Sequence, residues 1–127
     1  MRFLLDTHVL IWAISDPDRL GRVRDEIASS RNAVFFSAAS IWEIAIKAAL
    51  RRSDFEIDPH EVIDEASLLG FVELAITAKV AATVRDLPGI HHDPFDRLLV
   101  AQAVAEPVVL LTADSKLAGY SDLVRLV

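Results

Sequence analysis

Three short runs of consecutive apolar residues, each followed by a polar residue, constrain the fold of this chain most. The runs span residues 3–5, 33–36 and 108–111, and the polar residues that follow them are Asp6, Ser37 and Thr112. A continuous apolar run of this length is typical of a strand covered on both faces, as in a parallel sheet. Because segments of helical character separate the runs, we predict an α/β fold with a mostly parallel central sheet flanked by helices.

The segments between the runs contain signals for the starts of helices. We expect Thr7 to cap a helix over residues 8–14. Ser40 and Glu43 have the spacing of a capping box, which predicts the start of a helix that continues to residue 50. Between residues 41 and 50 only Glu43 and Lys47 are polar, so we expect this helix to be buried nearly all round. Further helices are expected over residues 21–30 and 59–69 and after Thr77, with weaker strands over 71–74 and 123–127.

The length and composition limit the class of protein. A chain of 127 residues has the size of one domain, which we place over residues 1–127. No apolar stretch is typical of a membrane span or a signal peptide, so we expect a cytoplasmic protein with no membrane partner. The absence of cysteine leaves carboxylates and histidines as candidate metal ligands. A formal net charge of −6 argues against nonspecific coating of nucleic acid but does not exclude a nuclease.

The stretch HHDPFDRLLVAQA, residues 91–103, changes abruptly from a polar loop to an apolar helix. Asp93 followed by Pro94 has the form of an N-cap residue with proline at the first helical position. This places Asp96 in the first helical turn, where free backbone donors and the helix dipole stabilise a carboxylate. Asp96 therefore suits metal binding, although the same pattern also occurs in helix caps that have no chemical role.

Four acidic residues are expected to meet at the carboxyl edge of the predicted sheet. Asp6 ends the first strand, and Glu43 follows the second strand by less than two helical turns. Asp96 heads the helix that leads into the last strand, and Asp114 follows that strand. Two like charges about 6 Å apart repel by roughly 3 kcal/mol at an effective dielectric of about 20, so such a cluster needs a counter-ion. Mg²⁺ or Mn²⁺ suits these oxygen donors and can activate water for hydrolysis of a phosphodiester.

In four segments the chain resembles PIN-domain ribonucleases, specifically the VapC-like toxins of type II toxin-antitoxin pairs. The segments are LLDTHVLIW, SAASIWEIAIK, HHDPFDRLLVAQA and LLTADSKL. The resemblance implies a PIN-like three-layer domain that cleaves RNA with Mg²⁺ or Mn²⁺. It also implies an acidic metal and catalytic site of Asp6, Glu43, Asp96 and Asp114, supported by Thr7 and Thr112. The implied partners are the RNA substrate, a cognate antitoxin and a second copy of the chain.

Three further residues near the central stretch are candidates for the site. Asp93 has the alternative role of a helix cap, and Arg97 could hold a phosphate or pair with Asp93. His92, like His91, could contact RNA or water, but exposed loop histidines are common. Trp12 and Trp42 lie in apolar helices, which favours core or interface roles over base stacking. By the resemblance, an antitoxin tail would use a hydrophobic groove and pair an arginine with the acids.

Three other classes of protein share parts of this sequence pattern. A haloacid-dehalogenase-type phosphatase needs a second aspartate two residues after the first, and that position is His8. A phospho-receiver domain needs an aspartate and a lysine where Ser37 and Thr112 stand. The main alternative is a catalytically inactive PIN-fold module that binds protein, in which the acids only cap helices. The sequence leaves open the RNA target, the number of metals and the identity of the antitoxin.

Overall fold

A parallel sheet of five strands forms the centre of the computed structural model, which describes residues 1–50, 56–89 and 93–127. The strand order is β3-β2-β1-β4-β5, and every neighbouring pair is parallel. The strands are β1 (Arg2–Leu5), β2 (Ala33–Ser37), β3 (Val72–Leu74), β4 (Val109–Thr112) and β5 (Val124–Leu126). The three apolar runs therefore form the three central strands, as the sequence predicts.

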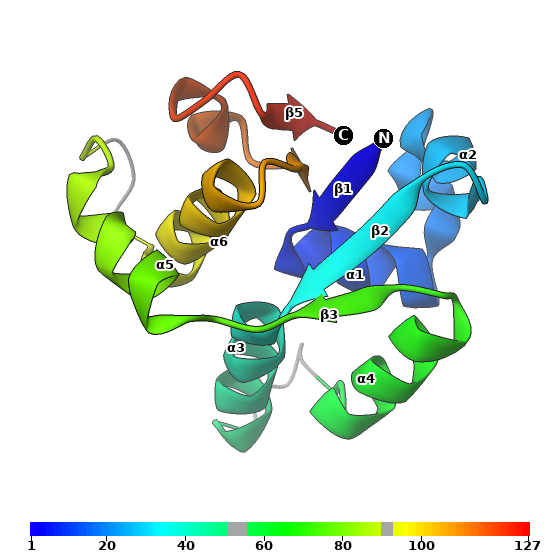
Figure 1. Cartoon of the computed structure of the whole chain (residues 1–127). Coiled ribbons are helices and arrows are strands. Elements are labelled where there is room, and N and C mark those ends of the chain that lie inside the picture. Colours follow the sequence, from blue (N-terminus) through cyan, green and yellow to red (C-terminus); the bar gives the residue numbers. More distant parts are fainter. Residues whose placement is uncertain (51–55, 90–92) are drawn as a thin grey trace.

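Helices lie on both sides of this sheet (Figure 1). The α-helices are α1 (Thr7–Ser15), α2 (Val23–Ala28), α3 (Ala38–Ala49), α4 (Pro59–Leu68), α5 (Ala78–Thr83) and α6 (Pro94–Ala105). Short 3₁₀ helices are η1 (Pro17–Leu20), η2 (Val84–Asp86) and η3 (Ser115–Gly119). No helix of the described ranges is both long and apolar enough to cross a membrane. The predicted stop of α4 is confirmed at Gly70, whose φ of 85° is a conformation that favours glycine.

The central strand β1 divides the core into two parts. Phe3 and Leu5 face a cluster formed with α1, α2 and α4, whereas Leu4 faces a cluster formed mainly with α6 and η3. Side chains alternate between the faces of a strand, so burial of all three residues requires cover on both sides. The structure therefore confirms the predicted three-layer α/β architecture.

Two helix starts differ from the prediction. The side chain that caps α1 belongs to Asp6, whose carboxylate accepts a hydrogen bond from the Val9 N–H, so Thr7 is already helical. Helix α3 is capped by Ser37 and begins at Ala38, so the capping box predicted further along the chain is wrong. In both cases the polar residue that follows the apolar run, Asp6 or Ser37, has the extended backbone of an N-cap, and the helix begins at the next residue.

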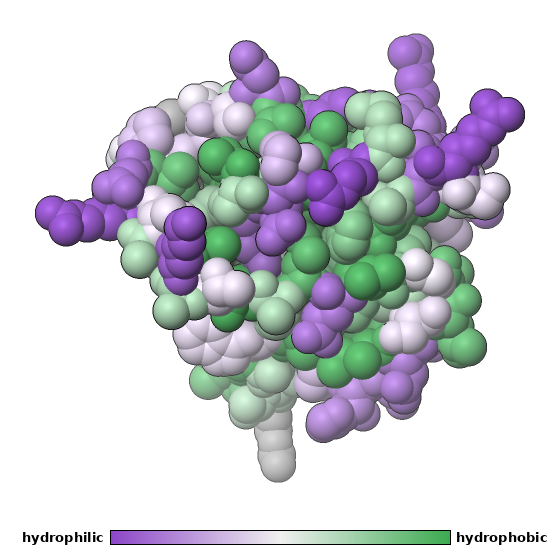
Figure 2. Space-filling view, viewed as in Figure 1, coloured by the Kyte–Doolittle hydropathy of each residue, from purple (hydrophilic) through white to green (hydrophobic). Residues whose placement is uncertain are grey.

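The surface of α3 also differs from the prediction of a helix buried nearly all round. Its polar residues Ser40 and Glu43 are buried, whereas Trp42 is 60% exposed and Leu50, directly after the helix, is 62% exposed. The buried side of the helix thus carries both polar residues and the core residue Ile44, and the large apolar side chain of Trp42 faces outward. Other large apolar side chains, such as Leu68 and Val72, are also exposed, and in Figure 2 hydrophobic patches alternate with charged side chains on one face.

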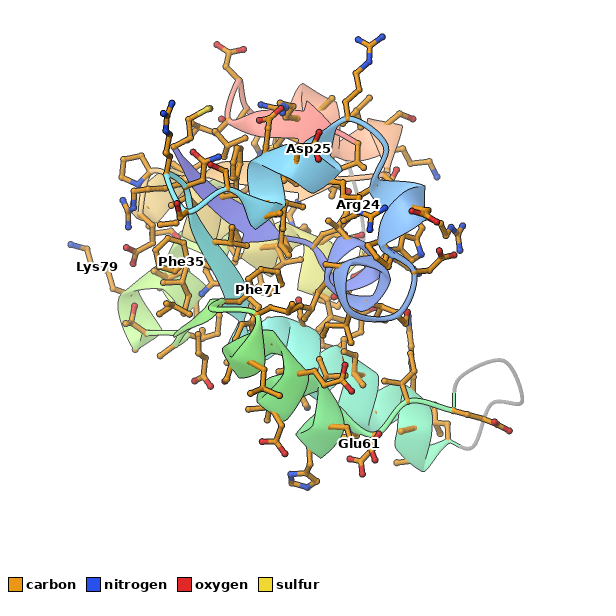
Figure 3. The ribbon with its side chains drawn as sticks, turned by 90° about the vertical axis from the view of Figure 1, so that its right-hand side faces the viewer. Arg24, Asp25, Phe35, Glu61, Phe71 and Lys79 are labelled. Atoms are coloured by element: carbon orange, nitrogen blue, oxygen red, sulfur yellow. The ribbon has the colours of Figure 1, made fainter. Side chains whose placement is uncertain are left out.

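The helix predicted over residues 21–30 is shorter in the structure, where α2 begins at Val23 and ends at Ala28. Val23 and Ile27 are buried in the core, whereas Ala28 is exposed. Charged residues of this helix, including Arg24 and Asp25, lie on its outer side (Figure 3). The helix thus covers one face of the sheet with only two of its side chains.

The strand order reverses direction between β1 and β4. From β1 the chain adds β2 and β3 on one side, then returns to add β4 and β5 on the other. At such a reversal the connections leave the carboxyl ends of the two strands in opposite directions and open a crevice there, which is where α/β proteins bind ligands. Asp6 follows β1 and Thr112 ends β4, so both lie at this position.

Candidate active site

A pocket of about 430 Å³ lies at the carboxyl edge of the sheet. Five acidic residues line it, namely Asp6, Glu43, Asp93, Asp96 and Asp114. They come from the ends of β1 and β4, the second turn of α3 and the start of α6. The structure therefore brings together in one pocket all four acids that the sequence singled out as a metal site, together with Asp93, which the sequence left open between a site residue and a helix cap.

Asp6 is the most constrained of these acids and is only 5% exposed. One carboxylate oxygen accepts a hydrogen bond from the Val9 N–H at 2.8 Å, and the other accepts one from the Thr112 hydroxyl. Burial raises the pKa of the Asp6 carboxyl; the hydrogen bonds from Thr112 and Val9 act in the opposite direction, and the charge of Glu43 adds to the increase. A positive charge in the pocket would therefore favour the ionised form of Asp6.

Thr112 connects the two central strands at this point. Its hydroxyl donates to Asp6 and accepts a hydrogen bond from the Asp114 N–H at 3.0 Å. The Asp6 N–H in turn donates to the carbonyl oxygen of Leu111 at 3.0 Å. The supporting position expected for Thr112 thus corresponds to hydrogen bonds that hold Asp6 and the Asp114 loop together.

Both carboxylate oxygens of Glu43 have partners inside the protein. The Thr7 hydroxyl donates to Oε1 at 2.6 Å, and the Lys47 ammonium lies 2.9 Å from Oε2. Thr7 Oγ1 also lies 3.1 Å from Ser40 Oγ. Because Thr7, Ser40 and Glu43 are all buried, this cluster fixes the orientation of Glu43 between α1 and α3.

The N-terminus of α6 has the predicted arrangement. Asp93 is the N-cap, and its Oδ1 accepts hydrogen bonds from the N–H groups of Phe95 and Asp96 at 2.9 and 3.2 Å. Pro94 occupies the first position and Asp96 the third. Asp114 is likewise a cap, because its Oδ1 accepts a hydrogen bond from the Lys116 N–H at 3.0 Å. Asp93 and Asp114 therefore combine a capping role with a place in the wall of the pocket.

Arg97 is not among the residues that line the pocket. Its guanidinium donates to the carbonyl oxygens of Val84 and Pro88 at 2.9 and 2.8 Å, and to the Tyr120 hydroxyl at 3.2 Å. These bonds give Arg97 a structural role between η2, the loop after it and η3. His92, the other candidate in this stretch, lies outside the described residues, as does His91.

His8, Trp12 and Lys47 also line the pocket. The rings of His8 and Trp12 lie 6.3 Å apart, and the guanidinium of Arg19 lies 4.3 Å above the Trp12 ring. The sequence favours a core or interface role for Trp12. In the structure its ring is half-buried and forms part of the pocket wall. His8 and Trp12 are four residues apart in the helix that starts after Asp6. This spacing is the sequence signal that places the two side chains on one face of the helix.

The chemistry of the donors fits a hard divalent cation, but the acids do not form a ready-made ligand shell. Within residues 1–50, 56–89 and 93–127, no three acidic or histidine side chains are grouped as a metal site. Internal partners hold Asp6 and Glu43 where they lie. Since Mg²⁺ keeps several waters and needs only one or two carboxylates, the pocket can still provide its ligands.

The sequence pattern of the PIN domain family matches residues 3–123, and the chain belongs to this family. Within the family the chain is VapC-like. It is 30% identical over 122 residues to Ribonuclease VapC22 of Mycobacterium tuberculosis (strain ATCC 25618 / H37Rv), with 92% of this chain and 90% of that protein covered. The resemblance read from the four sequence segments is therefore confirmed.

Solved structures with the same fold include two VapBC proteins. The chain is similar to a chain of VapBC2 from Rickettsia felis, solved bound to a DNA fragment from their promoter (18% identity, TM-score 0.71, 100% of this chain and 98% of that chain covered). It is also similar to a chain of VapBC-1 from nontypeable Haemophilus influenzae (18% identity, TM-score 0.64, 100% and 97% covered). At these identities the similarity concerns the fold.

Proposed function

We propose that this protein is a ribonuclease that hydrolyses RNA phosphodiester bonds with Mg²⁺ or Mn²⁺ and acts as the toxin of a toxin-antitoxin pair. The observation that carries the proposal is the convergence of Asp6, Glu43, Asp96 and Asp114 on one pocket at the reversal of the sheet. The name of the relative, Ribonuclease VapC22, supports the reaction class. The VapBC structures with the same fold support an antitoxin partner.

In this proposal the acidic residues hold the metal, and their neighbours hold the acids. Asp6, Glu43 and Asp96 hold the metal directly or through its bound waters, and Asp114 takes an outer position. When bound, the metal supplies an activated water and neutralises charge on the phosphate. Thr7 and Thr112 orient Glu43 and Asp6 through their hydroxyl groups. Because these supports are already in place, the chain loses little conformational freedom when substrate arrives.

The exposed apolar stripe of α3 supports the proposal of protein partners. Trp42, Ile46 and Leu50 are spaced by four residues and are all exposed. We propose that this chain forms a homodimer and binds a cognate antitoxin in the cytoplasm, with RNA as the substrate. Sedimentation equilibrium of the isolated chain tests the dimer.

Substitution of the acids tests the nuclease activity. Asp6→Asn, Glu43→Gln and Asp96→Asn should each abolish Mn²⁺-dependent cleavage of RNA while circular dichroism stays unchanged. Asp114→Asn should lower the rate less, because its carboxylate already caps η3. Asp25→Asn is the matched control, since this residue lies on the outer side of α2 (Figure 3). Wild-type cleavage by purified Asp6→Asn would refute the proposal.

The second candidate is an inactive PIN-fold module that binds protein. The observation that favours it is that Asp6, Asp93 and Asp114 each cap a helix, and that the described acids form no ready-made metal cluster. A calorimetric titration with Mn²⁺ separates the two candidates. Saturable binding that Asp96→Asn weakens supports the nuclease, whereas the absence of saturable binding to the wild type supports the binding module.

A further inference from the structure

The ion pair between Glu43 and Lys47 places a positive charge inside the acidic pocket. Lys47 Nζ lies 2.9 Å from Glu43 Oε2, and both residues line the pocket. The side chain of Glu43 is only 8% exposed and that of Lys47 is 29% exposed. This pair therefore differs from an exposed pair on a helix surface, which water and salt would screen.

The pair leaves Glu43 no oxygen without a close partner. Oε1 accepts the hydrogen bond from Thr7, and Oε2 faces the ammonium group. The Thr7 hydroxyl carries no net charge and can stay when a cation approaches, whereas the ammonium group repels a cation at the same carboxylate. A divalent metal that uses Glu43 as a ligand must therefore compete with Lys47.

A lysine is well suited to leave such a pair. Its ammonium is a compact charge on a flexible stem of four carbons, without the rigid two-point geometry of an arginine. Lys47 reaches Glu43 from one turn further along α3, and its partly exposed side chain can rotate toward solvent without any change in the backbone. The protein can thus exchange Lys47 for another cation at low conformational cost.

The buried carboxylates explain why a cation is present at all. Asp6 and Glu43 are 5% and 6% exposed and line the same pocket. Two buried carboxylates repel each other, and a positive charge nearby offsets this repulsion. We propose that Lys47 is a built-in counter-ion that neutralises Glu43 in the metal-free protein and is displaced when a divalent metal binds. This inference rests on the proposed metal-dependent function.

The affinity for Mn²⁺ alone tests the competition. In calorimetric titrations of the full chain, Lys47→Met and Lys47→Gln should lower the Kd for Mn²⁺ about tenfold, because no ion pair has to be broken. Lys116→Gln is the matched control, since it removes the same charge from an exposed position two residues after Asp114. It should change the Kd less than twofold. An unchanged or higher Kd in both Lys47 variants would overturn the proposal.

The displacement itself can be measured in the wild-type protein. The chain contains three lysines, Lys47, Lys79 and Lys116. Lys79 and Lys116 are exposed, and Figure 3 shows Lys79 projecting from the surface. With an amine-acylating reagent and mass spectrometry, saturating Mg²⁺ should raise the labelling rate of Lys47 several-fold and leave the other two unchanged. A Lys47 rate that stays constant or falls would contradict displacement.

The two experiments also separate this inference from the proposed function. A protein that binds Mn²⁺ and cleaves RNA, yet shows no change at Lys47, remains a nuclease without a built-in counter-ion. A protein in which neither wild type nor any Lys47 variant binds Mn²⁺ refutes both proposals.

Discussion

The hydrogen bond from Thr7 to Glu43 allows a quantitative test of how the pocket is held together. Both residues are buried, at 4% and 6% exposure, and the donor and acceptor lie 2.6 Å apart. A hydrogen bond to a charged group contributes about 1.5–3 kcal/mol. Thr7→Val replaces the hydroxyl with a methyl group of similar size and leaves Glu43 with one partner fewer. We expect the free energy of unfolding to fall by about 2 kcal/mol.

Urea unfolding in EDTA measures this loss. For a slope of about 2 kcal/mol per molar urea, the midpoint should fall by about 1 M. Thr83→Val is the matched control, because the Thr83 hydroxyl donates to the carbonyl oxygen of Val80 in its own helix. Its removal should cost about 1 kcal/mol or less.

A double-mutant cycle with Glu43→Gln isolates the charged hydrogen bond from other effects. In the Glu43→Gln background the acceptor is neutral, so Thr7→Val should cost about 1 kcal/mol less than in the wild type. The Lys47 ion pair is absent from both halves of that background and cancels. Equal losses in the two backgrounds would refute the role assigned to this hydrogen bond.

Three further outcomes are expected. In EDTA, the Asp6→Asn variant should become more stable relative to wild type as the pH rises above about 4. Because the pKa of Asp6 is raised in the fold, the folded wild-type protein keeps a proton that the unfolded chain releases, and wild type therefore loses stability as the pH rises. Urea midpoints from pH 4 to 8 check this. Asp93→Ala should lose about 1 kcal/mol of stability through the α6 cap, and Asp93→Asn clearly less, by the same assay. Gly70→Ala should lower stability by about 1–2 kcal/mol, since its φ of 85° disfavours a side chain; an unchanged midpoint would contradict this.

The edge of the sheet that carries the site could be predicted from the sequence because strands and their ends leave strong signals. The apolar runs indicate both the strands and the residues at their ends, so the positions of Asp6 and Thr112 at the edge of the sheet can be predicted from the sequence. Asp93 and Pro94 together indicate the start of α6, and this start places Asp96 in the first helical turn. These features depend on local chemistry and on the parallel topology alone.

The partners of the site residues could not be predicted, because they depend on tertiary packing. Ser40 and Glu43 have the spacing of a capping box, yet Thr7 from another helix engages Glu43 in the interior. Arg97 stands next to Asp96 in the sequence, but its side chain turns to the carbonyl oxygens after α5. The sequence predicted that α3 is buried nearly all round, but it could not tell that Glu43 lies inside together with Ile44 while Trp42 and Ile46 face outward.

The connection of Asp6 to Thr112 has a consequence for synthesis of the chain on the ribosome. These two residues are separated by 106 positions, so β1 can pair with its neighbour β4 only after all the residues between them have been translated. Contacts of such long range form late, because the loop between them must first be closed. A nascent chain therefore has no assembled pocket until β4 has emerged and docked. Since translation proceeds from the N-terminus, Asp6 is synthesised well before the strand β4 whose Thr112 binds its carboxylate.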